Sequence, residues 1–194
     1  MTNFYCGIMI ENKKLGEIAE IFAGARLSRF DSGVTKKQKV LKRTQEDGIF
    51  LDYEIMDISN DLNEKYYSKK DDIIVLLAGS NTVSKIDEEG YIIPMYYAAI
   101  RVKEDYDADF IYHLLKSEIF ERELNRLVEG TTLKILKTNH LREINLPLPS
   151  YSKQKEYGEL LSLMDQRINL KKESIKIEEK IQNSIINDLV EENQ

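Results

Sequence analysis

The sequence predicts an α+β protein in which a mixed α/β domain, residues 1–150, precedes one long C-terminal α-helix, residues 151–194. Three observations predict this division. Apolar runs with strand-like spacing are joined by one helical pattern before residue 150. Two of the three prolines, Pro147 and Pro149, follow them and favour extended backbone. The rest of the chain has no proline and one glycine, Gly158, which suits an unbroken helix.

The composition sets the size and the setting of the fold. The 194 residues, 42% hydrophobic and 32% charged, suffice for one ordinary domain and an appendage. The single cysteine, Cys6, excludes an internal disulfide and a cysteine-based zinc framework, so we expect a reducing, cytoplasmic setting. The first residues lack the basic and long apolar stretches of a signal peptide, and no window reaches the ~18 apolar residues of a membrane span. We therefore expect no membrane partner.

Four segments of the first domain carry short apolar patterns. Residues 15–22 are a short piece with apolar spacing, and residues 48–58 alternate with the period of a half-buried strand. The unbroken apolar run 72–77 predicts a buried strand. Residues 91–102 are rich in β-branched and aromatic side chains, and Pro94 makes their first part an edge or a bulge.

One helix is predicted in the first domain, over residues 107–127. Asp107 suits its N-cap, and Asp109 suits the positive end of the helix dipole. Apolar residues follow with helical spacing until Glu129 and Gly130 end the pattern.

The segment from residue 152 to about 190 has the apolar spacing of one long amphipathic helix, interrupted by Lys171 and Glu178. A helix of this length, about 55 Å, has no room to bury its apolar stripe on the domain that it leaves. It therefore predicts a coiled-coil element, and its near-neutral charge argues against a basic DNA-gripping helix. The predicted dimer stripe consists of Tyr157, Leu161, Met164, Ile168, Ile175, Ile181 and Ile185.

Charge is unevenly distributed although the net charge is only −6. Residues 26–43 carry seven bases and one acid, whereas residues 46–72 carry nine acids and three bases. Basic side chains suit phosphates, and Arg, Gln and Asn read base edges. The alternative is that the two adjacent segments neutralise each other or lie on solvated loops. A second polar and basic patch consists of Thr131, Thr132, Lys134, Lys137, Thr138 and Asn139.

The motifs of the enzymes that act on DNA are missing from the sequence. No Asn/Asp-Pro-Pro-aromatic loop of an amino-methyltransferase is present, because the only prolines are at positions 94, 147 and 149. The turn at residues 78–81 has neither the second glycine nor the lysine of a phosphate-binding loop. The two histidines lie far apart without triad spacing. We expect a binding module with a helical arm, no catalytic residue and no metal site.

The order of these parts resembles the specificity subunits of type I restriction–modification systems. Residues 14–21 with Gly24 are similar to the entry segment of that family, and residues 71–79 to its central strand and glycine turn. Residues 107–117 are similar to its domain helix, and residues 130–154 to its closing segment and the start of its conserved helix. Each piece is degenerate, but the ordered set covers nearly the whole chain. The family usually carries two recognition domains and two long helices, and here one of each is present; Lys153 also replaces a usual acid.

The resemblance implies a target-recognition domain that reads a DNA half-site, and a helix that sets half-site spacing and docks other subunits. Separate modification subunits would transfer methyl groups from S-adenosylmethionine, so this chain would bind no cofactor, and a restriction subunit is a further partner. Self-pairing of the helix would give a homodimer and a palindromic bipartite target. The residues expected at double-stranded DNA are Arg26, Arg29, Lys36, Lys37, Gln38, Lys39, Lys42, Arg43, Ser80, Asn81, Thr131, Thr132, Lys134 and Lys137.

Three alternatives remain open. The acidic balance favours a protein-only adaptor whose working surface is the long helix. An inactive spare half would fold and dimerise without directing methylation. A stand-alone nuclease is disfavoured by the missing motifs. Target bases, half-site spacing, the self-pairing itself and the coupling to cleavage do not follow from the sequence.

Overall fold

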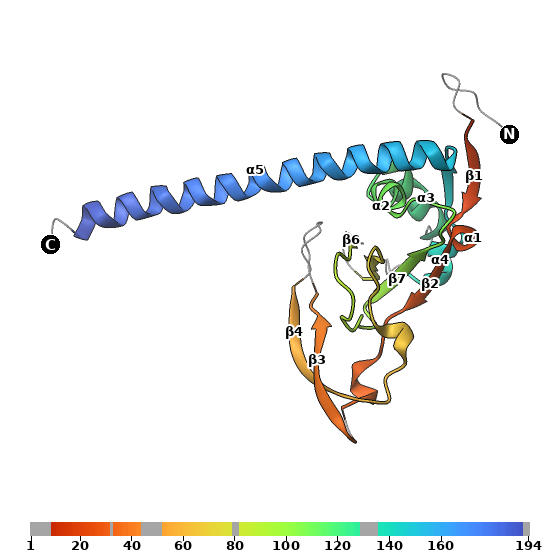
Figure 1. Cartoon of the computed structure of the whole chain (residues 1–194), viewed down its shortest axis with the longest axis horizontal. Coiled ribbons are helices and arrows are strands. Elements are labelled where there is room, and N and C mark those ends of the chain that lie inside the picture. Colours follow the sequence, from red (N-terminus) through yellow and green to blue (C-terminus); the bar gives the residue numbers. More distant parts are fainter. Residues whose placement is uncertain (1–8, 32, 44–51, 79–81, 129–135, 192–194) are drawn as a thin grey trace. The chain divides into compact units, whose positions relative to one another are not determined.

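The computed structural model describes residues 9–31, 33–43, 52–78, 82–128 and 136–191 (Figure 1). The chain forms two compact units, Met1–Gly158 and Glu159–Gln194. In the described residues the first unit holds the strands and the short helices, and the second is helical. The predicted α+β class, a mixed α/β domain followed by a long helix, is confirmed, and the functional division at residue 150 stays a prediction.

A four-stranded antiparallel sheet forms the centre of the first unit. Its order is β2 (Ala19–Ala23), β7 (Tyr97–Val102), β5 (Ile73–Leu76) and β6 (Val83–Lys85). All four residues of β5 are buried, which confirms the strand predicted over residues 72–77. The pattern 91–102 becomes a strand only in its second half, because a turn closed by the Tyr97 N–H and the Pro94 carbonyl (3.0 Å) precedes β7.

Two antiparallel pairs flank this sheet. The strands β1 (Glu11–Lys14) and β8 (Asn145–Leu148) join the two ends of the unit, and β3 (Thr35–Leu41) pairs with β4 (Tyr53–Ser59). We call the β3–β4 pair the ribbon. The strand β4 contains the second half of the segment 48–58, for which the sequence predicts a strand-like alternation. Residues 48–51 of that segment lie outside the described residues.

Four α-helices cover the sheet: α1 (Leu15–Ile18), α2 (Ala108–Leu115), α3 (Glu118–Val128) and α4 (Thr138–Arg142). The predicted N-cap is confirmed, because an Asp107 carboxylate oxygen accepts the Phe110 N–H at 2.8 Å. The single helix predicted over 107–127 is wrong. It breaks at Lys116 and Ser117, where the Ser117 hydroxyl donates to the Leu114 carbonyl at 2.7 Å and competes with the helical ladder.

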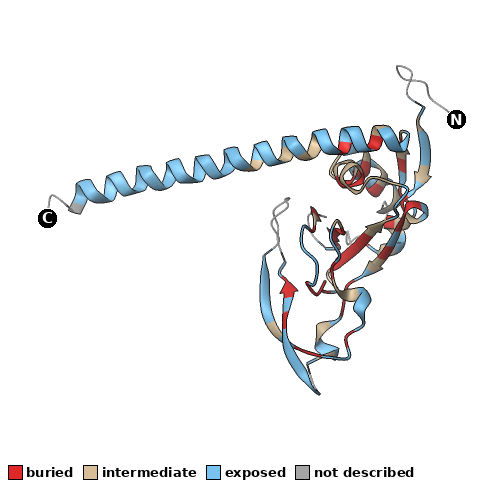
Figure 2. Ribbon diagram, in the orientation of Figure 1, coloured by how far each residue is buried: buried red, intermediate tan, exposed pale blue. Residues whose placement is uncertain are grey.

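Buried residues gather on the central sheet and on the helices packed against it (Figure 2). One core joins the inner faces of β2, β5 and β7 to α1–α4 and β8. A second core lies on the other face of the sheet around Tyr97, and a third lies under the ribbon around Val40, Ile58 and Ile92. The ribbon is thus attached to the sheet by its own apolar contacts.

The long helix α5 (Tyr151–Glu191) has 41 residues, or about 60 Å at 1.5 Å per residue. Gln154 fixes its first turn in the first unit and is only 2% exposed. The Gln154 amide oxygen accepts the Asp107 N–H at 3.2 Å, and its amide nitrogen donates to the Pro149 carbonyl at 2.9 Å. Two buried polar groups are satisfied in this way, and the start of α5 is tied to the N-terminus of α2.

Candidate nucleic-acid interface

The basic segment 26–43 contains a short turn and one strand of the ribbon. It begins with a 3₁₀ turn, η1 (Leu27–Arg29), and continues into β3. The Ser59 N–H donates to the Phe30 carbonyl at 2.8 Å, which ties the turn to the end of β4. The structure therefore places Arg26 and Arg29, both exposed, beside the end of the ribbon.

The register gives the ribbon two different faces. Lys37 lies opposite Asp57, and Lys39 lies opposite Ile55, on the face that points to solvent. Ile55 is 55% exposed. Because cross-strand partners share a face, the two lysines, Ile55 and the exposed Asp57 form one row. Lys36 is also exposed but belongs to the opposite face.

Tyrosine rings surround one of these lysines. The Lys39 ammonium lies 4.9 Å from the ring centroid of Tyr53 and 5.4 Å from that of Tyr91. The two rings are 5.5 Å apart and tilted. Each ring face attracts the cation and holds it at the surface. The Tyr91 hydroxyl donates to Glu88 at 2.7 Å, and this hydrogen bond, with burial, raises the pKa of Tyr91 to about 12.

The inner face of the ribbon contains Gln38, which sequence reasoning placed among the DNA-reading residues. Gln38 is only 9% exposed, and its amide nitrogen donates to the Tyr67 hydroxyl at 2.9 Å. In a strand its side chain points to the side of Val40, toward the third core. This geometry gives Gln38 a structural contact, and its reading of base edges stays an untested prediction that its burial opposes.

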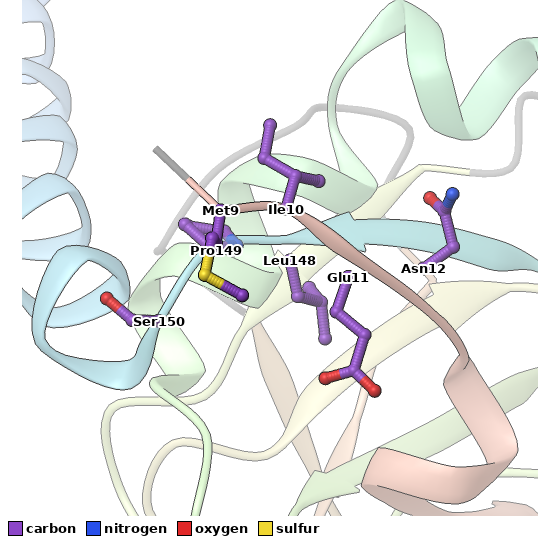
Figure 3. Close-up of a pocket in the computed structure, with 7 residues that line it drawn as sticks. All are labelled: Met9, Ile10, Glu11, Asn12, Leu148, Pro149 and Ser150. Carbon is purple, nitrogen blue, oxygen red and sulfur yellow. The ribbon is translucent and has the colours of Figure 1, made fainter. Parts of the chain in front are cut away.

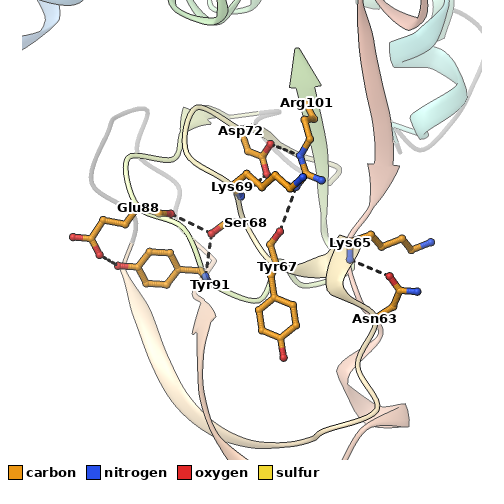
Figure 4. A network of polar contacts seen from close by, with 9 residues as sticks. All are labelled: Asn63, Lys65, Tyr67, Ser68, Lys69, Asp72, Glu88, Tyr91 and Arg101. Atoms are coloured by element: carbon orange, nitrogen blue, oxygen red, sulfur yellow. Dashed lines mark hydrogen bonds and ion pairs between the residues drawn. The ribbon is translucent and has the colours of Figure 1, made fainter. Parts of the chain in front are cut away.

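A polar network supports the loops behind the ribbon (Figure 4). The Arg101 guanidinium donates to both carboxylate oxygens of Asp72, at 2.8 and 2.7 Å, and to the Tyr67 carbonyl at 3.3 Å. The Ser68 hydroxyl accepts the Tyr91 N–H at 3.0 Å and donates to the Glu88 carbonyl at 3.2 Å. These bonds position Tyr67, which contacts Gln38, and Tyr91, which contacts Lys39.

The far end of the basic segment is anchored to the central sheet. Lys42 forms an exposed ion pair with Asp52 at 3.1 Å, and the Arg43 guanidinium donates to the Ala78 carbonyl at 3.0 Å. The segment thus ends beside the residues that follow β5. The predicted contacts Ser80 and Asn81 come next in the chain and lie outside the described residues.

Of the second predicted patch, Lys137, Thr138 and Asn139 are described, whereas Thr131, Thr132 and Lys134 lie outside the described residues. Lys137 is exposed and precedes α4, which packs beside β2 and away from the ribbon (Figure 1). The structure therefore does not bring Lys137 together with the ribbon.

The predicted dimer stripe is exposed on α5. Met164, Ile168, Ile175, Ile181 and Ile185 are between 46% and 55% exposed. Tyr157 belongs to the first unit and is 37% exposed, and Leu161 has intermediate exposure. A row of half-exposed aliphatic side chains along a helix is typical of a surface that binds another helix.

A shallow pocket of about 510 Å³ lies beside the β1–β8 pair (Figure 3). It is lined by Met9, Ile10, Glu11, Asn12, Leu148, Pro149 and Ser150. Glu11 is its one titratable side chain and lies 3.4 Å from Lys13. This pocket does not hold a nucleophile with a neighbouring base.

Two features are absent from the described residues. Among them no cluster of three His, Cys, Asp or Glu side chains has the arrangement of a metal site. None of the helices in the same residues combines the length and the apolarity needed to span a membrane.

The sequence did not indicate three residues that lie on or beside the ribbon: Tyr53 and Ile55 of β4, and Tyr91, which contacts Lys39. The alternation over residues 48–58 contained the signal for the first two, because it put both on one face of a strand. The contact of Tyr91 with Lys39 joins positions 52 residues apart, and no local pattern shows it.

The fold and the surface together define a binding module with a helical arm. Its globular unit presents lysines among tyrosines on an anchored ribbon, and its arm presents an exposed apolar stripe. The chain belongs to the type I restriction modification DNA specificity domain family, whose model matches residues 9–180. This membership confirms the resemblance to type I specificity subunits that the sequence predicts.

Curated relatives agree with this membership. The chain is 33% identical over 102 residues to the type I restriction enzyme MjaVIII specificity subunit of Methanocaldococcus jannaschii, a match that covers 53% of this chain and 24% of the relative. It is 27% identical over 115 residues to the putative type I specificity subunit S.MpnORF638P of Mycoplasma pneumoniae, covering 58% and 30%. The matches span less than a third of the length of these relatives.

Solved structures share the fold. The HsdS subunit from Thermoanaerobacter tengcongensis superposes with a TM-score of 0.62 at 14% identity, over 82% of this chain and 43% of that one. The type I S subunit from M. genitalium gives a TM-score of 0.56 at 18% identity, over 87% and 43%. At these identities the likeness shows the fold alone.

Proposed function

We propose that this chain binds double-stranded DNA through its ribbon, reads one half-site, and directs methyltransferase subunits to a bipartite target. The observation that carries the proposal is the solvent face of the ribbon, in a chain of the specificity family. Lys37, Lys39 and Ile55 form one exposed row there, with Asp57 opposite Lys37.

The ribbon has the dimensions and the chemistry for a major groove. That groove of B-DNA admits a two-stranded β-ribbon, and it exposes phosphates at its rims and thymine methyl groups on its floor. Lys37 and Lys39 supply charge for the phosphates, and Ile55 supplies an apolar contact. The attachment of the ribbon to the third core keeps these side chains in a fixed register.

The chain is proposed to act by positioning, without catalysis. Methyl transfer from S-adenosylmethionine, and cleavage where a restriction subunit is present, would belong to partner subunits in a cytoplasmic complex. The exposed surface of α5 is a candidate docking site for those subunits. The same exposed helix also favours the second candidate function, a protein-only adaptor, since an adaptor needs that surface alone.

The two candidates differ in salt-dependent DNA binding. We expect the chain to bind duplex DNA with an affinity that falls steeply between about 50 and 200 mM salt, because phosphate contacts release counterions. Lys37→Ala and Lys39→Ala should each weaken binding and reduce the slope of log affinity against log salt by about 1. Fluorescence anisotropy on a random-sequence duplex measures both quantities.

The matched control is Lys172→Ala, which removes an exposed lysine from α5. It should leave the affinity and the slope unchanged. Absence of salt-dependent binding, or equal losses in the control, would contradict the ribbon as the DNA surface and favour the adaptor.

A further inference from the structure

One carboxylate lies on the solvent face of the ribbon, among the side chains proposed to meet DNA. Asp57 of β4 is exposed and lies opposite Lys37 in the register. Among the described residues, none forms an ion pair or a hydrogen bond with its carboxylate. A carboxylate repels the phosphates that a DNA-binding surface attracts. Its place on this face therefore calls for a role other than phosphate binding.

The two strands of the ribbon carry different chemistry on this face. The strand β3 contributes Lys37 and Lys39. The strand β4 contributes Tyr53, Ile55 and Asp57, and its seven residues include no lysine or arginine. Phosphate contacts position a protein on the duplex, whereas contacts to base edges carry the sequence information. The cations of β3 suit the first task, and the apolar and acceptor groups of β4 suit the second.

The edges of the bases in the major groove decide what a carboxylate can read. An ionised carboxylate only accepts hydrogen bonds. Guanine presents two acceptors in that groove, and thymine presents an acceptor and a methyl group, so neither offers a donor. Adenine presents its amino group beside the N7 acceptor, which repels the second carboxylate oxygen. Cytosine presents its N4 amino group without an acceptor on the same edge of its ring, so it fits Asp57 best.

We propose that Asp57 makes the ribbon specific for cytosine at one position of the half-site. The N4 amino group of that cytosine donates a hydrogen bond to the Asp57 carboxylate. The inference rests on the proposed DNA binding by the ribbon and adds the base that one of its residues reads. Lys37 offsets the repulsion between this carboxylate and the DNA backbone, because opposite charges on one face attract each other. Asp57 thus lowers the affinity for DNA in general and raises it for one base.

A purely structural role of Asp57 gives a different expectation. As the cross-strand partner of Lys37 alone, Asp57 would stabilise the ribbon, and its loss would weaken binding to all sequences alike. If Asp57 reads a base, its loss removes a repulsive charge and raises the affinity for random-sequence DNA. The same loss abolishes discrimination at a single position. Affinity and specificity then change in opposite directions.

Selection of duplexes from a random library identifies the base with the full chain. The unaltered chain should enrich cytosine at one position, and Asp57→Asn should change that base to adenine. The reason is that an asparagine amide both donates and accepts, which matches the N7 and N6 groups of adenine. Asp57→Ala should lose the preference at that position alone. The matched control, Glu54→Gln, removes an exposed acid from the other face of β4 and should leave every position unchanged.

A modified base tests the hydrogen bond itself. In the selected duplex, 2-pyrimidinone replaces the cytosine, which removes the N4 amino group and keeps the rest of the ring. The unaltered chain should lose affinity by about tenfold, within the range of one specific base contact. Asp57→Ala should bind both duplexes equally and should bind a random-sequence duplex more tightly than the unaltered chain does. Fluorescence anisotropy measures all of these affinities.

The opposite results overturn the proposal. If Asp57→Asn keeps the base at every position, Asp57 does not read DNA. Losses of preference at several positions would assign Asp57 a structural role in the ribbon. An unaltered chain that binds DNA with salt dependence but binds the two duplexes equally excludes this contact and leaves the proposed function intact. Absence of salt-dependent binding removes the proposed function and this inference together. Circular dichroism checks that all variants are folded.

Discussion

At the residue scale, two ion pairs near the ribbon differ in burial and should therefore differ in their contribution to stability. Asp72 is 1% exposed and receives two hydrogen bonds from Arg101, whose side chain is mostly buried. The Asp52–Lys42 pair is exposed at both ends. The hydrogen bond to Asp72 raises the pKa of Arg101 further, so the guanidinium stays charged at physiological pH.

Asp72→Ala should destabilise the first unit by about 3–5 kcal/mol, because it leaves a half-buried guanidinium without its carboxylate. It also removes the acceptor of the Lys69 N–H, at 2.8 Å. Asp52→Ala should cost less than about 1 kcal/mol. Urea denaturation of both variants measures the difference, and equal losses would show that the Arg101 network does not support the loops behind the ribbon.

Residue roles were the part of the surface that the sequence predicted least well. The basic segment was found from its composition, and the structure gathers it into η1 and β3. Its side chains are divided between two faces, however, and Gln38 belongs to the buried one. A count of charges does not show which side chains point to which face of a strand. Lysines at successive positions conceal the alternation between the two faces.

At the element scale, the start of α5 packs closely on the N-terminus of α2. A Cβ at Gly158 would overlap the Asp107 carboxylate and lie 2.9 Å from the Phe110 amide nitrogen. Asp107 has little freedom to move, since it caps α2 through that same amide.

Gly158→Ala should therefore lower the stability of the first unit by about 1–3 kcal/mol, the usual cost of overpacking. Helix propensity alone would predict a gain of about 1 kcal/mol for this change. Glu159→Ala, one position along the helix, serves as the control and should have little effect. A rise in thermal stability of Gly158→Ala would show that α5 does not press on the α2 cap.

The Asp107 cap should also make stability depend on pH. Burial raises the pKa of this carboxyl, against the opposing hydrogen bond from Phe110. A folded pKa above the unfolded pKa gives a stabilising contribution that is full below the unfolded pKa and is lost as pH rises through the folded pKa. Asp107→Asn keeps a capping oxygen and removes the titration. Its stability relative to the unaltered chain should rise from acidic to neutral pH in urea denaturation, and a constant difference would contradict a raised pKa.

The sequence predicted correctly those elements that depend on neighbouring residues alone. The buried strand β5 and the cap at Asp107 follow from an apolar run and from hydrogen-bond chemistry. The break between α2 and α3 was missed because the apolar spacing continues across it, while the Ser117 hydroxyl ends the ladder. The short piece at residues 15–22 divides into α1 and β2, since the pairing of β2 with β7 comes from distant residues.

At the scale of the whole molecule, the self-pairing of α5 that the family resemblance predicts should combine with DNA recognition. Two ribbons related by a two-fold axis present the same contacts in opposite directions, so a dimer binds an inverted repeat with both units. The second unit then binds as an intramolecular event at high effective concentration. A monomer has only the affinity of one ribbon.

Selection of duplexes from a random library measures this directly. The unaltered chain should enrich inverted repeats with one fixed gap, because a paired α5 holds the spacing constant. Ile175→Glu, which puts a charge into the predicted dimer stripe, should enrich single half-sites of the same sequence with lower affinity. Lys39→Ala should weaken both products without changing the gap, since it alters the ribbon and leaves the helix intact. A dimeric chain that enriches only single half-sites would show that the pairing of α5 and the reading of DNA are not coupled.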